Sequence, residues 1–183
     1  MKQIILLTLL VVSASILAEV VTFPDSKLEK FIRKEIKKPT GDILDTDLIG
    51  ETYFYADSEG ISDLRGLEYC TGLKKLLLRE NSITDLSPLS GLKNLKKLWL
   101  SHNSITDLSP LSGLTNLESL LLSDNNISDV SPLGGLTSLT FLRLAENNLA
   151  DISPLSGLAN MGWLDLDDNS ISDIKVISLA LQT

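Results

Sequence analysis

The residues best suited to chemistry are a serine and a histidine in the middle of the chain. Ser101 and the only histidine, His102, are adjacent, and aspartates lie nearby. A serine, a histidine and an aspartate form a nucleophilic triad when the ring contacts the hydroxyl and the aspartate orients the ring. Adjacent side chains on a strand point to opposite faces, and no residue orients the imidazole in this interpretation. The sequence therefore favours a surface histidine over a triad.

The second candidate is a metal site in an acidic run, Asp165-Leu-Asp-Asp-Asn, which is similar to the start of a calcium-binding loop. The loop needs a glycine at its sixth place and a glutamate at its twelfth, but Ser170 and Val176 stand there. We interpret the run as an acidic rim and expect no metal and no cofactor. The sequence also contains no phosphate loop, zinc spacing or nucleophile elbow, so we expect no enzyme.

These residues are positioned by a 22-residue repeat, which occurs five times between Leu73 and Asp173. Each copy has apolar residues eight, five and three positions before an asparagine, an apolar residue two after it and an aspartate four after it. The asparagines are Asn81, Asn103, Asn125, Asn147 and Asn169. Ser-Pro-Leu follows in the first four copies. A fixed period in the twenties built on L-x-x-L-x-L-x-x-N is the leucine-rich-repeat pattern.

The spacing within each copy predicts its local structure. The alternating x-Leu-x-Leu-x segment predicts a short strand with one buried face, and five such strands in parallel would make a sheet about 19 Å wide. The asparagine amide can pair with the main chain of the following turn. Ser-Pro predicts a return leg of one 3₁₀ turn, with the serine as N-cap and the aspartates as further turn caps. A repeat cannot bury its apolar side alone, so stacking stabilises it.

The unit L-x-x-L-x-x-L-x-L-x-x-N-x-I-x-D-[LIV]-S-P-L-x-x resembles the repeat of bacterial internalin-type leucine-rich-repeat proteins. The run Phe-Pro-Asp-x-x-Leu-Glu-x-x-Ile-Arg, beginning at Phe23, is similar to the N-terminal helical cap of secreted bacterial members. The resemblance implies an α/β solenoid: a right-handed horseshoe with a parallel concave sheet, short 3₁₀ turns on its convex side and an N-terminal helical cap.

The segment before the repeats has two parts. Residues 1–18 combine Lys2, an apolar run and a small residue at Ala18, which predicts a secretory signal peptide. The apolar run is shorter than the roughly 20 residues of a membrane-spanning helix. Residues 19–50 predict the cap, with an amphipathic helix that starts near Pro24 and stops at Pro39. A second short helix is expected around residues 43–49.

The remaining boundaries follow from the repeat. Residues 51–72 form a degenerate first repeat, in which Phe54 and Ala56 take the places of strand leucines. Residues 73–183 hold the five repeats, and the last is atypical because Ser-Pro-Leu does not follow Asp173. The single cysteine, Cys70, excludes an intramolecular disulfide and takes a position that is leucine in later copies, so we expect a buried thiol.

The strand positions that point out of the concave sheet vary between copies, and we expect them to carry the function. They present both tryptophans and Phe141, with positive charge towards one end and negative charge towards the other. The candidate ligand-binding residues are Lys75, Leu77, Arg79, Lys97, Trp99, Leu121, Phe141, Arg143, Trp163, Asp165 and Asp167. Exposed aromatic residues rimmed by charge are typical of protein-binding surfaces, although single exposed apolar residues also occur on every protein.

We therefore predict a secreted, periplasmic or cell-surface binding module that recognises a protein ligand without catalysis. The net charge of −8 argues against nucleic acid and against anionic membrane surfaces. Two alternatives stay open. Eukaryotic phosphatase-regulating proteins use a similar repeat, which suggests an intracellular regulatory subunit. The second alternative is a structural role, in which the protein associates with itself through the edge of its last strand. We expect a monomer, and the alternative is a dimer formed through that edge.

Overall fold

The structure is a computed structural model, and it describes residues 18–172. The predicted signal peptide, apart from Ala18, and the predicted atypical end from Asp173 onwards lie outside these residues. Within the described part of the chain, no helix is long and apolar enough to cross a lipid bilayer.

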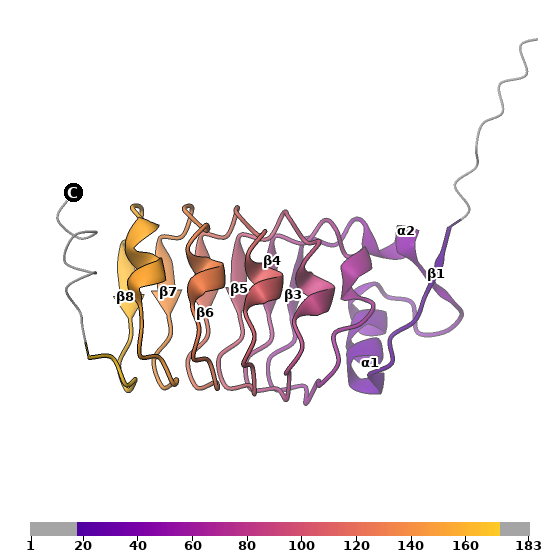
Figure 1. The fold of residues 1–183 in the computed structure, drawn as a ribbon. Coiled ribbons are helices and arrows are strands. Elements are labelled where there is room, and N and C mark those ends of the chain that lie inside the picture. Colours follow the sequence, from indigo (N-terminus) through magenta and orange to yellow (C-terminus); the bar gives the residue numbers. More distant parts are fainter. Residues whose placement is uncertain (1–17, 173–183) are drawn as a thin grey trace, which may run out of the picture.

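One parallel sheet of six strands runs through the molecule in sequence order (Figure 1). The strands are β3 (Tyr53–Tyr55), β4 (Lys75–Leu77), β5 (Lys97–Trp99), β6 (Ser119–Leu121), β7 (Phe141–Arg143) and β8 (Trp163–Asp165). Each residue pairs with the residue 22 positions later, as Leu76 does with Leu98. The sheet thus has one strand more than the five expected. The additional strand is β3 of the degenerate repeat, in which Phe54 pairs with Leu76 of β4.

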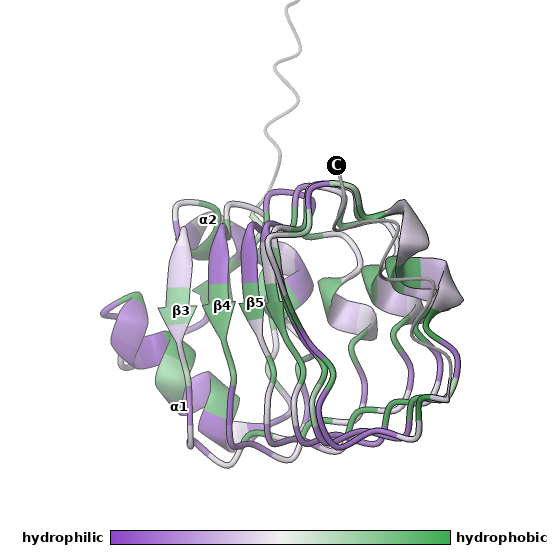
Figure 2. Ribbon diagram, turned by 90° about the vertical axis from the view of Figure 1, so that its left-hand side faces the viewer, coloured by the Kyte–Doolittle hydropathy of each residue, from purple (hydrophilic) through white to green (hydrophobic). Residues whose placement is uncertain are grey.

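Short 3₁₀ turns line the side opposite the sheet (Figure 2). They are η1 (Leu67–Tyr69), η2 (Ser87–Leu89), η3 (Ser109–Leu111), η4 (Ser131–Leu133) and η5 (Ser153–Gly157). Together with the parallel sheet, they confirm the predicted leucine-rich-repeat solenoid. Between the two sides lies one continuous core of leucine and isoleucine, in which Leu98 and Leu120 are fully buried.

The serines were predicted to be the N-caps of the 3₁₀ turns, but the N-cap lies one residue earlier. Ser87 is the first residue of η2, and the N-cap is Leu86, whose side chain makes no cap hydrogen bond. The cap comes from Asp85: its Oδ1 accepts the Ser87 N–H at 2.8 Å and its Oδ2 accepts the Ser87 hydroxyl at 2.8 Å. An aspartate two residues ahead can reach both groups, whereas a serine within the turn cannot cap itself.

The predicted asparagines form a ladder inside the turn that follows each strand. Asn125 is representative: its Nδ2 donates to the carbonyl oxygens of Leu100 (3.1 Å) and Leu122 (3.0 Å), and its Oδ1 accepts the N–H of Ile105 (2.9 Å). Leu122 belongs to its own repeat, whereas Leu100 and Ile105 belong to the preceding one. Each asparagine therefore ties two adjacent turns together.

A second asparagine ladder was not predicted. Asn94, Asn116 and Asn160 donate from Nδ2 to a carbonyl oxygen 23 residues earlier, at 2.9, 2.8 and 2.8 Å. These asparagines precede the strands by three residues and lie at the surface. In the repeat between Asn116 and Asn160 a serine, Ser138, takes the same place, which hid the period in the sequence.

The cap at the N-terminal end contains β1 (Val20–Val21), α1 (Ser26–Glu35), β2 (Ile43–Leu44) and α2 (Asp45–Leu48). Its apolar stripe covers the first strand of the sheet: Phe31 packs edge-on against Phe54, with ring centroids 5.6 Å apart. The expected second helix is shorter than predicted. Ile43 and Leu44 instead form β2, which pairs antiparallel with β1. The pairing is favoured because Val20 and Val21 of β1 lie beside these two apolar residues as an extended partner.

Cys70 is buried as predicted, and burial raises the pKa of its thiol to about 12. Because only the thiolate is a good nucleophile, we expect no reaction of the folded protein with a disulfide reagent at pH 8. One equivalent should react once the protein is unfolded in guanidinium chloride, and absorbance of the released thiolate measures both states. Stoichiometric labelling of the native protein would contradict the burial.

Candidate binding surface

The solvent side of the sheet, predicted above as the concave face, carries the candidate binding residues; we call it the sheet face. Its central strand positions form two rows across the six strands. The rows are Tyr53, Lys75, Lys97, Ser119, Phe141 and Trp163, followed by Tyr55, Leu77, Trp99, Leu121, Arg143 and Asp165. Neither tryptophan is part of the leucine core, as expected for residues that were predicted to point outwards.

Two aromatic residues of this face were missing from the prediction. Tyr53 and Tyr55 lie on β3 and are 55% and 53% exposed, with ring centroids 5.5 Å apart. The signal was present, because Phe54 and Ala56 match the strand leucines of later repeats and the alternation places their neighbours outside. With Trp99, Phe141 and Trp163, five of the nine aromatic residues of the chain gather on one face.

One predicted binding residue is not available to a ligand. Leu77 lies on the sheet face but is only 7% exposed, because it sits between the larger side chains of its register partners Tyr55 and Trp99. The third outward position of the strands is also largely covered, since Ser101, Ser123 and Ala145 are buried there. Their side chains are too short to reach past the neighbouring residues.

Trp99 is held in place from two sides. The guanidinium carbon of Arg79 lies 5.0 Å from the centre of the Trp99 ring, within the range of a cation–π contact. Arg79 is itself fixed by Asp57, whose Oδ2 accepts from Nη2 at 2.6 Å and from Nε at 3.0 Å. The indole Nε1 donates to the hydroxyl of Ser119 at 3.3 Å. The ring is therefore pre-positioned, and little side-chain entropy remains to be lost on binding.

The C-terminal part of the face carries a second aromatic pair. The rings of Phe141 and Trp163 stack with centroids 6.1 Å apart and planes inclined by 7°, and Trp163 is 58% exposed. Beside them, Nε of Arg143 donates to Oδ2 of Asp165 at 2.8 Å. This hydrogen bond is the main cause that lowers the pKa of the Asp165 carboxyl, so the carboxylate stays charged and paired with Arg143 at neutral pH.

Between the two aromatic groups the face is hollowed. The hollow has a volume of about 470 Å³ and is lined by Lys97, Trp99, Glu118, Ser119, Leu121, Thr140 and Phe141. Trp99 on β5 and Phe141 on β7 form its walls, and β6 forms its floor. The floor is low because β6 carries the short Ser119 and the aliphatic Leu121 there. An apolar space with polar groups at its edge can hold one large side chain of a partner.

The acidic rim follows the C-terminal ends of the strands. Glu80, His102, Asp124, Glu146 and Asp168 each precede a ladder asparagine and share a left-handed backbone, with φ between 53° and 58°. His102 does have an orienting partner, contrary to the sequence interpretation: its Nδ1 lies 2.7 Å from Oδ2 of Asp124. The register brings these residues together, since they lie 22 positions apart. Ser101 is buried, and within residues 18–172 no hydrogen bond joins its hydroxyl to the His102 ring, so no triad forms.

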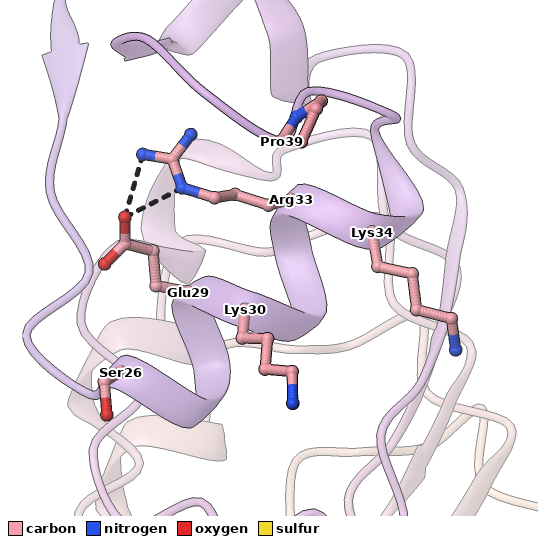
Figure 3. A pocket seen from close by; sticks show the side chains of 6 residues that line it. All are labelled: Ser26, Glu29, Lys30, Arg33, Lys34 and Pro39. Atoms are coloured by element: carbon pink, nitrogen blue, oxygen red, sulfur yellow. Dashed lines mark hydrogen bonds and ion pairs between the residues drawn. The ribbon is translucent and has the colours of Figure 1, made fainter.

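Other sites in residues 18–172 are weaker. No three side chains of histidine, cysteine, aspartate or glutamate gather there in a way that could hold a metal ion. A second hollow, of about 410 Å³, lies along α1 (Figure 3). It contains the pair of Arg33 and Glu29, whose Nη2 and Oε1 are 2.8 Å apart, and Lys30 and Lys34 extend from the same helix. These residues are ordinary polar surface of the cap.

The comparisons with known proteins agree with this architecture. The family model for leucine-rich repeats in two copies matches residues 71–113 and 115–160. No curated protein gives a significant match. Among solved structures, an internalin (inlF) from Listeria monocytogenes is 38% identical with a TM-score of 0.84; the match covers 86% of this chain and 47% of that one. Internalin C2 from the same species is 32% identical with a TM-score of 0.52, and the match covers 85% and 89% of the two chains.

A leucine-rich-repeat protein of Leptospira interrogans is 30% identical with a TM-score of 0.65, and the match covers 73% of this chain and 35% of that one. The chain thus spans about half of the first internalin and about a third of the Leptospira protein. The fold and the repeats define a leucine-rich-repeat protein. Within that class, the chain belongs to the internalin family.

Proposed function

We propose that this protein is a secreted or surface-exposed bacterial binding module that recognises a protein ligand through the sheet face and catalyses no reaction. The observation that carries the proposal is the apolar hollow between the fixed ring of Trp99 and the stacked pair of Phe141 and Trp163. Tryptophan, tyrosine and arginine are the residues that most often dominate binding energy at protein interfaces. A rigid solenoid presents them at fixed distances.

Secretion is part of this proposal and is supported by the features of residues 1–18 in the sequence. Internalin relatives of bacterial origin are consistent with it. The absence of a triad in the described residues supports binding rather than catalysis: His102 contacts Asp124, and Ser101 is buried with no hydrogen bond to the imidazole.

The test is a comparison of the purified protein with a Trp99→Ala, Phe141→Ala, Trp163→Ala triple variant. Each protein is immobilised and exposed to solubilised surface proteins of candidate host cells, and captured proteins are quantified by mass spectrometry. We expect at least one specific protein to be captured at least tenfold less by the triple variant. A Lys30→Ala, Lys34→Ala variant of the cap is the matched control and should capture it normally. Equal capture by all three proteins would reject the sheet face as the binding site.

A further inference from the structure

The hollow of the sheet face lies between two groups of unpaired charges of opposite sign. Resting on the function proposed above, we infer that the sheet face selects an extended protein segment with a fixed order of groups: a carboxylate, then one large apolar anchor side chain, then a cation. The order is set along the solenoid axis, from β4 to β8.

The positive end consists of Lys75 and Lys97, which are register partners on β4 and β5. Neither forms an ion pair with any residue from 18 to 172. The two arginines of the face differ in this respect, because Arg79 is neutralised by Asp57 and Arg143 by Asp165. The lysines therefore supply the free positive charge of the face, and they lie next to the hollow, which Lys97 itself lines.

The negative end consists of Asp167 and Asp168, directly after β8. Both are exposed, and neither forms an ion pair within the described part of the chain. Glu146, one repeat earlier and beside Asp168, is exposed and also lacks an ion pair there. The nearest cation on the face, Arg143, is occupied by Asp165. This end therefore attracts a lysine or arginine of the partner.

The strand spacing fixes the distances between the three groups. Neighbouring strands lie about 4.8 Å apart, so the hollow floor on β6 is about 5 Å from Lys97 and about 10 Å from Lys75. Asp167 is two strands from the floor and three residues further along the strand direction than Leu164, the register equivalent of Leu120, so it lies about 14 Å from the floor. An extended chain advances about 3.3 Å per residue. The partner carboxylate should thus lie two to three residues from the anchor, and the cation about four residues from it on the other side.

The charge order also determines what the face rejects. A uniformly acidic segment would meet Asp167 and Asp168 at one end, and a uniformly basic segment would meet Lys75 and Lys97 at the other. Like charges placed together cost binding energy and exclude wrong partners, whereas complementary charges fix register and speed association. The face is therefore suited to segments of low net charge that carry both signs.

A displayed library of random 12-residue peptides tests the inference without a known ligand. The library is selected against the full protein, against a Lys75→Glu, Lys97→Glu variant and against an Asp167→Lys, Asp168→Lys variant. We expect the wild-type protein to enrich peptides with an aromatic or large aliphatic residue between an acidic and a basic residue. The first variant should lose the acidic residue from the enriched set, and the second should lose the basic one, each by at least fivefold in frequency. A Lys30→Glu, Lys34→Glu variant should enrich the wild-type set.

Different outcomes overturn different claims. The inference is rejected if the enriched peptides need Trp99 and Phe141 but show no charge order. It is also rejected if their charge order is unchanged in both charge-reversed variants. Either result leaves the proposed function standing. Enrichment that is unaffected by Trp99→Ala with Phe141→Ala rejects both. No enrichment over that double variant rejects the inference alone, because a folded protein ligand would still be captured. Circular dichroism of each variant verifies that the solenoid is folded before selection.

Discussion

Replacing Asn125 by alanine is expected to lower the free energy of unfolding by about 3 kcal/mol, because several main-chain groups lose their partner at once. The side chain is only 7% exposed and satisfies the Ile105 N–H and the carbonyl oxygens of Leu100 and Leu122. A buried polar group left without a partner costs about 1–3 kcal/mol. Alanine cannot replace the amide, so the hydrogen bonds that join this repeat to the preceding one, to Leu100 and Ile105, are lost. Urea denaturation followed by circular dichroism measures the change.

The adjacent residue provides the matched control. Asn126 is exposed, and its side chain makes no hydrogen bond within the described part of the chain. Asn126→Ala should therefore change the free energy of unfolding by less than about 0.5 kcal/mol. If the two substitutions destabilise the protein equally, the ladder is not the source of the stability assigned to it. If Asn125→Ala is as stable as the wild-type protein, water has replaced the amide and the estimate fails.

The repeated part of the fold could be predicted because its information is local and periodic. A leucine such as Leu98 recurs every 22 residues, and the pleat of a strand then determines which residues face inwards. Phe54 and Ala56 were recognised as strand positions in the degenerate repeat, so β3 and the exposure of Tyr53 and Tyr55 followed from the same rule. The predicted binding residues did not include Tyr53 and Tyr55, although the alternation places both on the outer face.

Features that depend on contacts between distant residues could not be predicted in the same way. The alternation places Leu77 outside, but only the neighbouring Tyr55 and Trp99 determine that it is covered. Likewise, the charges of Arg79 and Asp57 are visible in the sequence. The two hydrogen bonds from the guanidinium to Asp57 Oδ2, which hold Arg79 against Trp99, require their register. For the candidate site, sequence therefore supplied the list of residues, and structure supplied which of them are paired, covered or free.

The same limit applies to the cap, where one carboxylate holds two segments together. Asp25 Oδ1 accepts the N–H groups of Lys27 (2.8 Å) and Leu28 (3.2 Å) at the start of α1. Its Oδ2 accepts from Ser62 N (2.7 Å), Ser62 Oγ (3.1 Å) and Asp63 N (3.2 Å) in the first repeat. The sequence predicted the helix start but not the second role, because Ser62 lies 37 residues away.

We expect Asp25→Ala to lower the free energy of unfolding by about 3 kcal/mol, since it removes an N-cap worth about 1 kcal/mol and charged hydrogen bonds worth about 1.5–3 kcal/mol. Asp25→Asn should cost about half as much, because asparagine caps helices well but turns an N–H donor towards Ser62 and Asp63. Asp42→Asn, an exposed carboxylate of the same cap, is the control and should be nearly neutral. Urea denaturation at pH 7 ranks the three variants.

The pH dependence separates the role of the charge from that of the shape. Burial acts to raise the pKa of Asp25, but the N–H donors of Ser62, Leu28, Lys27 and Asp63 together lower it below its ordinary value of 3.8. A carboxyl whose pKa is lower in the folded state stabilises the protein above its unfolded pKa, and this stabilisation is lost as the pH falls through the folded pKa. The difference in stability between the wild-type protein and Asp25→Asn should therefore be full at pH 6 and shrink steadily below about pH 4. A difference that stays constant from pH 6 to pH 3 would show that the asparagine fails through its geometry rather than through the missing charge.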